Sequence, residues 1–129
     1  TPTNAVYGFT MMMLLALREL KPDYAVVAWD APGKTFRHDH YKDYKATRKN
    51  APDELYEQFP LTKEVVDAFN IPLIEAPGYE ADDIIGTLTT QYEKNHEVVW
   101  MSCNLLLNML VSILCAKVLP IRFFIHLEK

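Results

Sequence analysis

A continuous apolar run at residues 24–29, YAVVAW, constrains the fold of this chain more than any other feature. Its β-branched and aromatic residues favour a strand, and the absence of polar alternation indicates that the strand is covered on both faces. A helix that Thr3 or Asn4 can cap and that runs to about Leu20 is predicted before it, because apolar residues recur at helical spacing: Val6, Phe9, Met13 and Leu17. Strands buried on both faces are typical of α/β domains with largely parallel sheets.

The pattern downstream repeats this alternation of helices and short strands. A helix is predicted from residue 53 to about residue 69, bent near Pro60, and a short strand at residues 71–74 follows it. A further helix over residues 82–94 and a strand over residues 97–101 complete the pattern. We therefore expect one α/β domain with a mostly parallel central sheet.

Acidic residues follow two of the predicted strands. Asp30 comes directly after the first, and Glu80, Asp82 and Asp83 crowd the start of the helix that follows the second. Ligands gather at the carboxyl ends of parallel strands, so these residues can share a site, and Mg²⁺ and Mn²⁺ prefer carboxylate ligands. Two other interpretations stay open: Asp30 can start a turn, and acids in a first helical turn stabilise the helix by about 0.3–1 kcal/mol each.

A basic and aromatic run, KTFRHDHYKDYKATRK at residues 34–49, lies between the two acidic points. The net charge is -4, but six of the thirteen lysines and arginines fall within this run. Arg37, Lys45 and Arg48 can neutralise phosphates while rings such as Tyr41 stack on unpaired bases. A solvated, charge-rich loop is the alternative, and the interleaving of rings with cations favours contact with nucleic acid.

The last quarter of the chain has a different composition. Only one of the seventeen acidic residues, Glu128, follows Val98, and residues 98–116 carry no formal charge. That length is sufficient to span a bilayer. In a helix, however, Asn104, Asn108 and Ser112 would form a polar stripe on one face, so we expect no membrane span.

Two cysteines and the lack of a secretory leader favour a reducing cytosol as the location. We expect a domain at residues 1–99 and a divergent apolar tail at residues 100–129.

Three motifs in sequence order resemble the 5′-nuclease domain of bacterial DNA polymerase I, a family related to the flap endonucleases. They are KTFRH at residues 34–38, YKATR at residues 44–48 and GYEADDIIGTL at residues 78–88. The resemblance covers residues 1–99. It implies a PIN-like, Rossmann-like fold that is incomplete here, because the family's first strand, which supplies another aspartate, would precede Thr1.

The resemblance also implies a two-metal site with Mg²⁺ or Mn²⁺ that hydrolyses DNA phosphodiesters near a 5′ end or flap. It assigns metal binding and catalysis to Asp30, Glu80, Asp82 and Asp83. It places Arg37, Lys45 and Arg48, on either side of Tyr41, in a basic arch that grips the 5′ strand. The implied partner is branched or single-stranded DNA, with a polymerase domain in the parent protein.

The chain departs from the family pattern after Val99. A Gly-Asp-x-Asp motif is expected there, but Cys103, Asn104 and Leu106 occupy its glycine and its two aspartates. An amide and a leucine cannot replace anionic oxygen ligands for a hard cation. The sudden change favours a truncated or frame-shifted reading of a longer gene over a decayed copy. We expect weak or no nuclease activity from this chain alone, and a non-catalytic DNA-binding fragment is the alternative function.

Overall fold

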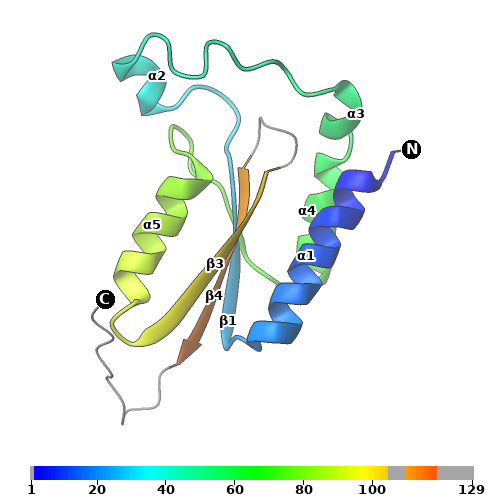
Figure 1. Cartoon of the computed structure of the whole chain (residues 1–129), viewed down its shortest axis with the longest axis vertical. Coiled ribbons are helices and arrows are strands. Elements are labelled where there is room, and N and C mark those ends of the chain that lie inside the picture. The colour runs from blue at the N-terminus through cyan, green and yellow to red at the C-terminus, as the bar shows by residue number, and fades with distance from the viewer. Residues whose placement is uncertain (1, 105–109, 119–129) are drawn as a thin grey trace.

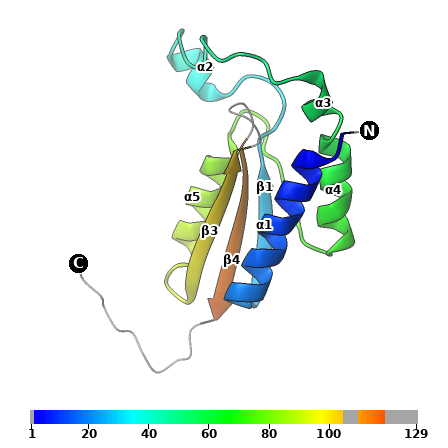
Figure 2. The ribbon, with the colours of Figure 1, turned by 45° about the vertical axis from the view of Figure 1, so that its right-hand side comes forward.

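A computed structural model describes residues 2–104 and 110–118 as a central sheet between two layers of helices (Figure 1). Helices α1 and α4 cover one face of the sheet, and α5 covers the other (Figures 1 and 2). In chain order the elements are α1 (Asn4–Leu20), β1 (Tyr24–Trp29), α2 (Phe36–His40), α3 (Asp53–Tyr56), α4 (Phe59–Ala68), β2 (Leu73–Ile74), α5 (Ala81–Tyr92), β3 (His96–Asn104) and β4 (Leu110–Val118).

The four strands have the order β2-β1-β4-β3 across the sheet. β1 and β2 pair in parallel, with Val27 opposite Leu73. β4 pairs antiparallel with both β1 and β3, so β1, β2 and β3 run in one direction and β4 in the other. The α/β class is confirmed, and the predicted direction holds for three strands, while β4 makes the sheet mixed.

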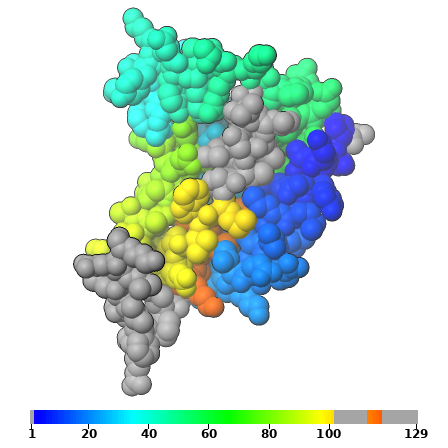
Figure 3. Space-filling view, in the orientation of Figure 1, coloured from blue at the N-terminus to red at the C-terminus, as the bar shows by residue number. Residues whose placement is uncertain are grey.

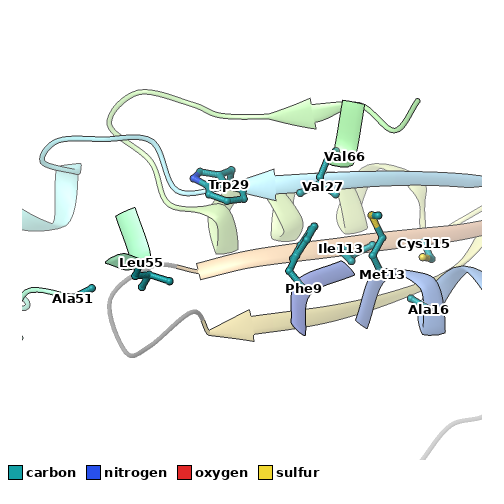
Figure 4. Packing of buried hydrophobic residues seen from close by; sticks show 10 residues of the cluster. All are labelled: Phe9, Met13, Ala16, Val27, Trp29, Ala51, Leu55, Val66, Ile113 and Cys115. Atoms are coloured by element: carbon teal, nitrogen blue, oxygen red, sulfur yellow. The ribbon is translucent and has the colours of Figure 1, made fainter. Parts of the chain in front are cut away.

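Alternate residues of the inner strands supply two separate cores. Val27 and Trp29 of β1 pack with α1 residues such as Phe9 and Met13 (Figure 4). Ala28 points to the opposite face, where it packs with Ile84 and the rest of the α5 cluster. This two-sided burial explains why residues 24–29 carry no polar alternation.

The predicted helix over residues 53–69 is two helices. α3 ends at Tyr56, and α4 starts at Phe59 with Pro60 in its first turn. The first turn tolerates proline because its N–H groups have no helical acceptor, whereas a continuous helix through Pro60 would lose a hydrogen bond. The predicted bend near Pro60 is therefore a break directly before it.

The uncharged segment is not helical in the part that the structure describes, and the strand predicted at residues 97–101 lies within β3. Residues 96–104 and 110–118 are strands, and β4 lies inside the sheet between β1 and β3. An uncharged run suits this position, because β4 is covered on both faces: Ile113 and Cys115 contact one core and Leu114 the other. Asn108 lies outside the described residues.

No helix among the described residues is long and apolar enough to cross a membrane. The boundary at residue 99 stays a prediction; β3 runs across it without a break.

The two tryptophans provide a matched test of the core. Trp29 is 1% exposed and packs edge-on against Phe59, with ring centroids 5.5 Å apart, whereas Trp100 is 53% exposed. Trp29→Ala should lower the free energy of unfolding by about 3–5 kcal/mol, because a large cavity opens in the core. Trp100→Ala should lower it by about 0.5 kcal/mol or less. Urea unfolding followed by circular dichroism measures both, and equal losses would contradict this packing.

Candidate active site

The site begins where the end of β1 meets the start of α5. Gly78 has a φ of 85°, a left-handed conformation that suits glycine, and it lies in a turn closed by the Tyr79 N–H donating to the Ala76 carbonyl (3.0 Å). This turn starts α5 at Ala81, whose N–H donates to Asp30 Oδ1 at 2.7 Å. Asp30 therefore joins the strand end to the first turn of α5.

Asp83 lies in the first turn of α5, and its carboxylate accepts hydrogen bonds from a backbone N–H and from a cationic side chain. The Glu80 N–H donates to Asp83 Oδ2 at 2.9 Å, which stabilises the start of the helix. The guanidinium of Arg37 reaches the same carboxylate with two hydrogen bonds, of 2.7 and 2.6 Å. Such two-pronged pairs are among the stronger hydrogen bonds in proteins. Arg37 thereby fixes the start of the basic run to the start of α5.

Glu80 is only 9% exposed, and its carboxylate contacts the next part of the basic run. Lys45 Nζ donates to Glu80 Oε1, and the Tyr44 hydroxyl lies 2.9 and 3.0 Å from the two carboxylate oxygens. Arg37 Nη1 adds a longer ion pair to Glu80 of 3.4 Å. A buried carboxylate requires such partners, and the side chains that supply them here come from residues 37–45.

The pKa values of the neighbouring acids shift in opposite directions because their partners differ. Burial opposes ionisation of Glu80, but the hydrogen bonds from Lys45 and Tyr44 outweigh it and lower the pKa of Glu80. The hydrogen bond from Arg37 lowers the pKa of Asp83. Desolvation raises the pKa of Asp82, and the charges of Asp30, Glu80 and Asp83 raise it further.

Asp30, Glu80 and Asp83 therefore lie close enough to Asp82 to raise its pKa, but the four predicted carboxylates do not converge. Among the side chains that the structure describes, at residues 2–101 and 113–117, no three of His, Cys, Asp or Glu are arranged to hold a metal ion. Asp30 accepts a backbone N–H, and Glu80 and Asp83 are held by cations. The described arrangement does not fit a metal site.

The predicted DNA-binding residues divide into two groups. Arg37 and Lys45 face the carboxylates, whereas Tyr41 and Arg48 are exposed. Their segment, α2 with the chain that follows it, lies beyond the end of the sheet (Figures 1 and 3).

Tyr44 is a site residue that the sequence did not reveal in this role. Its hydroxyl binds Glu80, thirty-six positions away, and no local spacing signals that contact. Of the residues at the expected Gly-Asp-x-Asp positions, Cys103 and Asn104 belong to β3, and Leu106 lies outside the described residues.

Comparison with known proteins agrees with these motifs. Residues 1–112 match the family model described as "5′-3′ exonuclease, N-terminal resolvase-like domain". The chain belongs to this 5′-3′ exonuclease family.

Named relatives of the family are similar over about seven-tenths of the chain. The DNA polymerase I of Chloroflexus aurantiacus is 56% identical over 90 residues, which are 70% of this chain and 9% of that protein. The DNA polymerase I of Caldicellulosiruptor bescii is 51% identical over 92 residues, 71% of this chain and 11% of the polymerase. The 5′-3′ exonuclease of Aquifex aeolicus is 47% identical over 93 residues, 72% of this chain and 32% of that protein. The match therefore spans about a tenth of these polymerases and about a third of the exonuclease.

Asp82 and Asp83 are adjacent, so their amide variants form a matched pair with opposite expected effects. The pKa of Asp82 is raised, which means that its charged form opposes folding at neutral pH. Asp82→Asn should leave the free energy of unfolding at pH 7 unchanged or raise it by up to about 0.5 kcal/mol, because solvent screens this exposed charge. Asp83→Asn should lower it by about 1–3 kcal/mol, because the Arg37 pair is broken.

The pH dependence gives the control. The pKa of Asp83 is lowered, so its contribution is complete above the ordinary carboxylate pKa of about 4 and is lost as the pH falls through the lowered value. The deficit of Asp83→Asn in urea unfolding should therefore shrink below about pH 4. A deficit that is constant down to pH 2, or one shared by Asp82→Asn, would contradict this assignment.

Proposed function

We propose that this chain provides the DNA-holding part of a metal-dependent 5′-3′ exonuclease and flap-type endonuclease. One observation carries the proposal: the basic segment at residues 34–49 is attached to the acidic start of α5 through Arg37, Tyr44 and Lys45. Cations that grip a phosphodiester must lie beside the groups that activate its cleavage, and the pairing of Arg37 and Lys45 with Asp83 and Glu80 supports this proposal.

The outer side of the same segment supports binding to a nucleic-acid strand. The ring of Tyr41 is 67% exposed, and Lys42 and Arg48 are also exposed. Cations supply the salt-dependent part of the affinity for phosphates, and exposed rings stack on unpaired bases. A single-stranded 5′ end or flap offers both phosphates and unpaired bases, whereas the bases of a closed duplex are paired and stacked.

Asp30, Glu80, Asp82 and Asp83 are the residues that we propose to act on a divalent cation, Mg²⁺ or Mn²⁺. Asp82 supports this part, because desolvation and the charges of three other carboxylates raise its pKa, a conflict that a bound cation relieves. Nucleases of this family are generally metal-dependent. Because the described arrangement does not fit a metal, we assign no catalytic step to it.

A second function, DNA binding without cleavage, is favoured by that same arrangement. Glu80 and Asp83 are held by Lys45 and Arg37, and no group of three ligands is present among the described residues. A fragment of this kind would hold branched or single-stranded DNA through residues 34–49 alone.

The relatives suggest the wider context. Several are named DNA polymerase I, and we infer that the chain corresponds to part of a protein with a polymerase domain. The described cysteine, Cys115, is a free and buried thiol, which is in keeping with a reducing cytoplasm.

Two exposed residues of the segment test the DNA-binding proposal by different means. Arg48→Ala should weaken binding to a 5′-flap DNA and reduce the slope of log affinity against log salt by about 0.7–0.9, since one phosphate contact is lost. Tyr41→Ala should weaken binding by about 1–3 kcal/mol with an unchanged slope, since stacking releases no counterions. Gel shifts at several salt concentrations without metal measure both.

Lys63→Ala is the control, because Lys63 lies on α4 and pairs with Glu75 at 2.7 Å. Equal effects of Lys63→Ala and Arg48→Ala, or salt-independent binding, would remove the DNA-binding assignment.

A nuclease assay separates the two functions. The chain, incubated with a labelled 5′-flap DNA and Mn²⁺, should give little or no product, because Glu80 and Asp83 are occupied by cationic side chains. The products are measured on a denaturing gel. Cleavage that Asp82→Ala abolishes would contradict this expectation and establish the enzyme function.

A further inference from the structure

The outer face of α1 is apolar, although the opposite face of this helix already packs on the sheet. Four large side chains on the outer face are between 40% and 69% exposed: Tyr7, Met11, Leu14 and Leu15. α1 belongs to an outer layer of the molecule, and its blue surface is in open view on the right of Figure 3. A helix that is apolar on all sides is normally covered on all sides.

This face differs from the other exposed apolar surface of the molecule. Among the described residues, every exposed large apolar side chain outside α1 is aromatic, whereas the exposed aliphatic ones, Met11, Leu14 and Leu15, all lie on α1. Single exposed apolar residues are ordinary on a protein surface. A continuous aliphatic stripe is more typical of an interaction surface.

The stripe has the spacing of a seam between two packed helices. Tyr7, Met11, Leu14 and Arg18 follow one another at intervals of four, three and four positions, which keeps them on one line along the helix. We call these four residues the α1 seam. It extends about 16 Å along α1.

The α1 seam is complementary to itself in one orientation. A two-fold axis that passes between Met11 and Leu14 makes two copies of α1 antiparallel, with Met11 opposite the partner's Leu14 and Tyr7 opposite the partner's Arg18. The Arg18 side chain is 73% exposed, and its guanidinium can lie on that tyrosine ring, which is a favourable contact. A parallel pair would instead bring two Arg18 guanidiniums together, and like charges repel.

Gly8 supports the close approach of a second helix. Glycine inside a helix is unfavourable relative to alanine, and a Cβ atom at Gly8 would have no described neighbour within 4 Å, so packing within the chain does not require glycine here. Gly8 and Leu15 are two helical turns apart and lie on the same side of the α1 seam. In the antiparallel pair, the partner's Leu15 can therefore fill the space beside Gly8.

We propose that the outer face of α1 is a homodimer interface, in which two copies of this chain pair their α1 helices antiparallel along the α1 seam. No residue of the candidate site belongs to this seam, so the inference does not rest on the proposed function. Two faces of this size bury less surface than an obligate interface, so we expect monomer and dimer to exchange at a concentration of about 100 µM.

Sedimentation equilibrium of the full 129-residue chain tests the interface. The mean molar mass should rise from that of one chain toward that of two between about 10 µM and 1 mM. Met11→Glu and Leu14→Lys should each weaken association at least about tenfold, because a charge then lies against an apolar side chain. Phe69→Glu is the matched control, because Phe69 is 41% exposed, against 40% for Leu14, and it lies at the end of α4; it should change association less than about twofold.

A mixture of the two variants tests the register. Position 11 of one copy faces position 14 of the other, so Met11→Glu mixed with Leu14→Lys should associate at least about tenfold more tightly than either variant alone, because the introduced charges attract each other. Circular dichroism checks that each variant folds. Met11→Lys with Leu14→Glu is the reciprocal pair, and it replaces the first pair if one of its members does not fold.

A mass of one chain at every concentration, or equal weakening by Phe69→Glu, would overturn the interface. A mixture that associates no more tightly than its components would overturn the antiparallel pairing. Neither DNA nor metal is present in these measurements. Their failure therefore leaves the gel shifts and the nuclease assay to decide the proposed function separately.

Discussion

The hydrogen bond from the Ala81 N–H to Asp30 is the contact on which the candidate site depends. β1 is fixed because its side chains fill cores on both faces of the sheet, so Asp30 at its end has a fixed position. Ala81 is fully buried and opens α5, so the same bond sets where that helix begins. The acids of the first turn follow from this placement. The packing of the core thus also sets the geometry of the site at this edge of the sheet.

Electrostatics then divides the acids of that first turn into two kinds. Glu80 and Asp83 are compensated by cations from residues 37–45, and their pKa values are lowered. Asp82 lies between them in sequence, and its pKa is raised by desolvation first and then by the charges of Asp30, Glu80 and Asp83, which outweigh the opposing charge of Arg37. Charge conflict that is left unrelieved in a fold is more typical of functional sites than of structural ones. Glu80 and Asp83 have structural roles, as helix caps and ion-pair partners. No such role accounts for Asp82.

Local patterns in the sequence predicted the parts of this fold that depend on local forces. The first helix and the strand at residues 24–29 lie where apolar spacing predicts them, because one buried face fixes the helix and burial on both faces fixes the strand. The segment after Met101 could not be assigned in this way. An uncharged run suits a buried strand and a buried helix equally, and one of the two strands that pair with β4, β1, is more than eighty positions away. The Tyr44–Glu80 contact was missed for the same reason: the sequence carries no signal for a long-range pair of polar side chains.

The acidic and basic halves of the site are held by different forces, and this separation has a functional consequence. The carboxylates belong to a sheet edge and a helix that are fixed by apolar packing. The cations belong to a segment that is held to α5 mainly by charged and polar side-chain contacts, which salt or a competing polyanion weakens. A phosphodiester that competes for Arg37 and Lys45 therefore acts on the weaker of the two attachments.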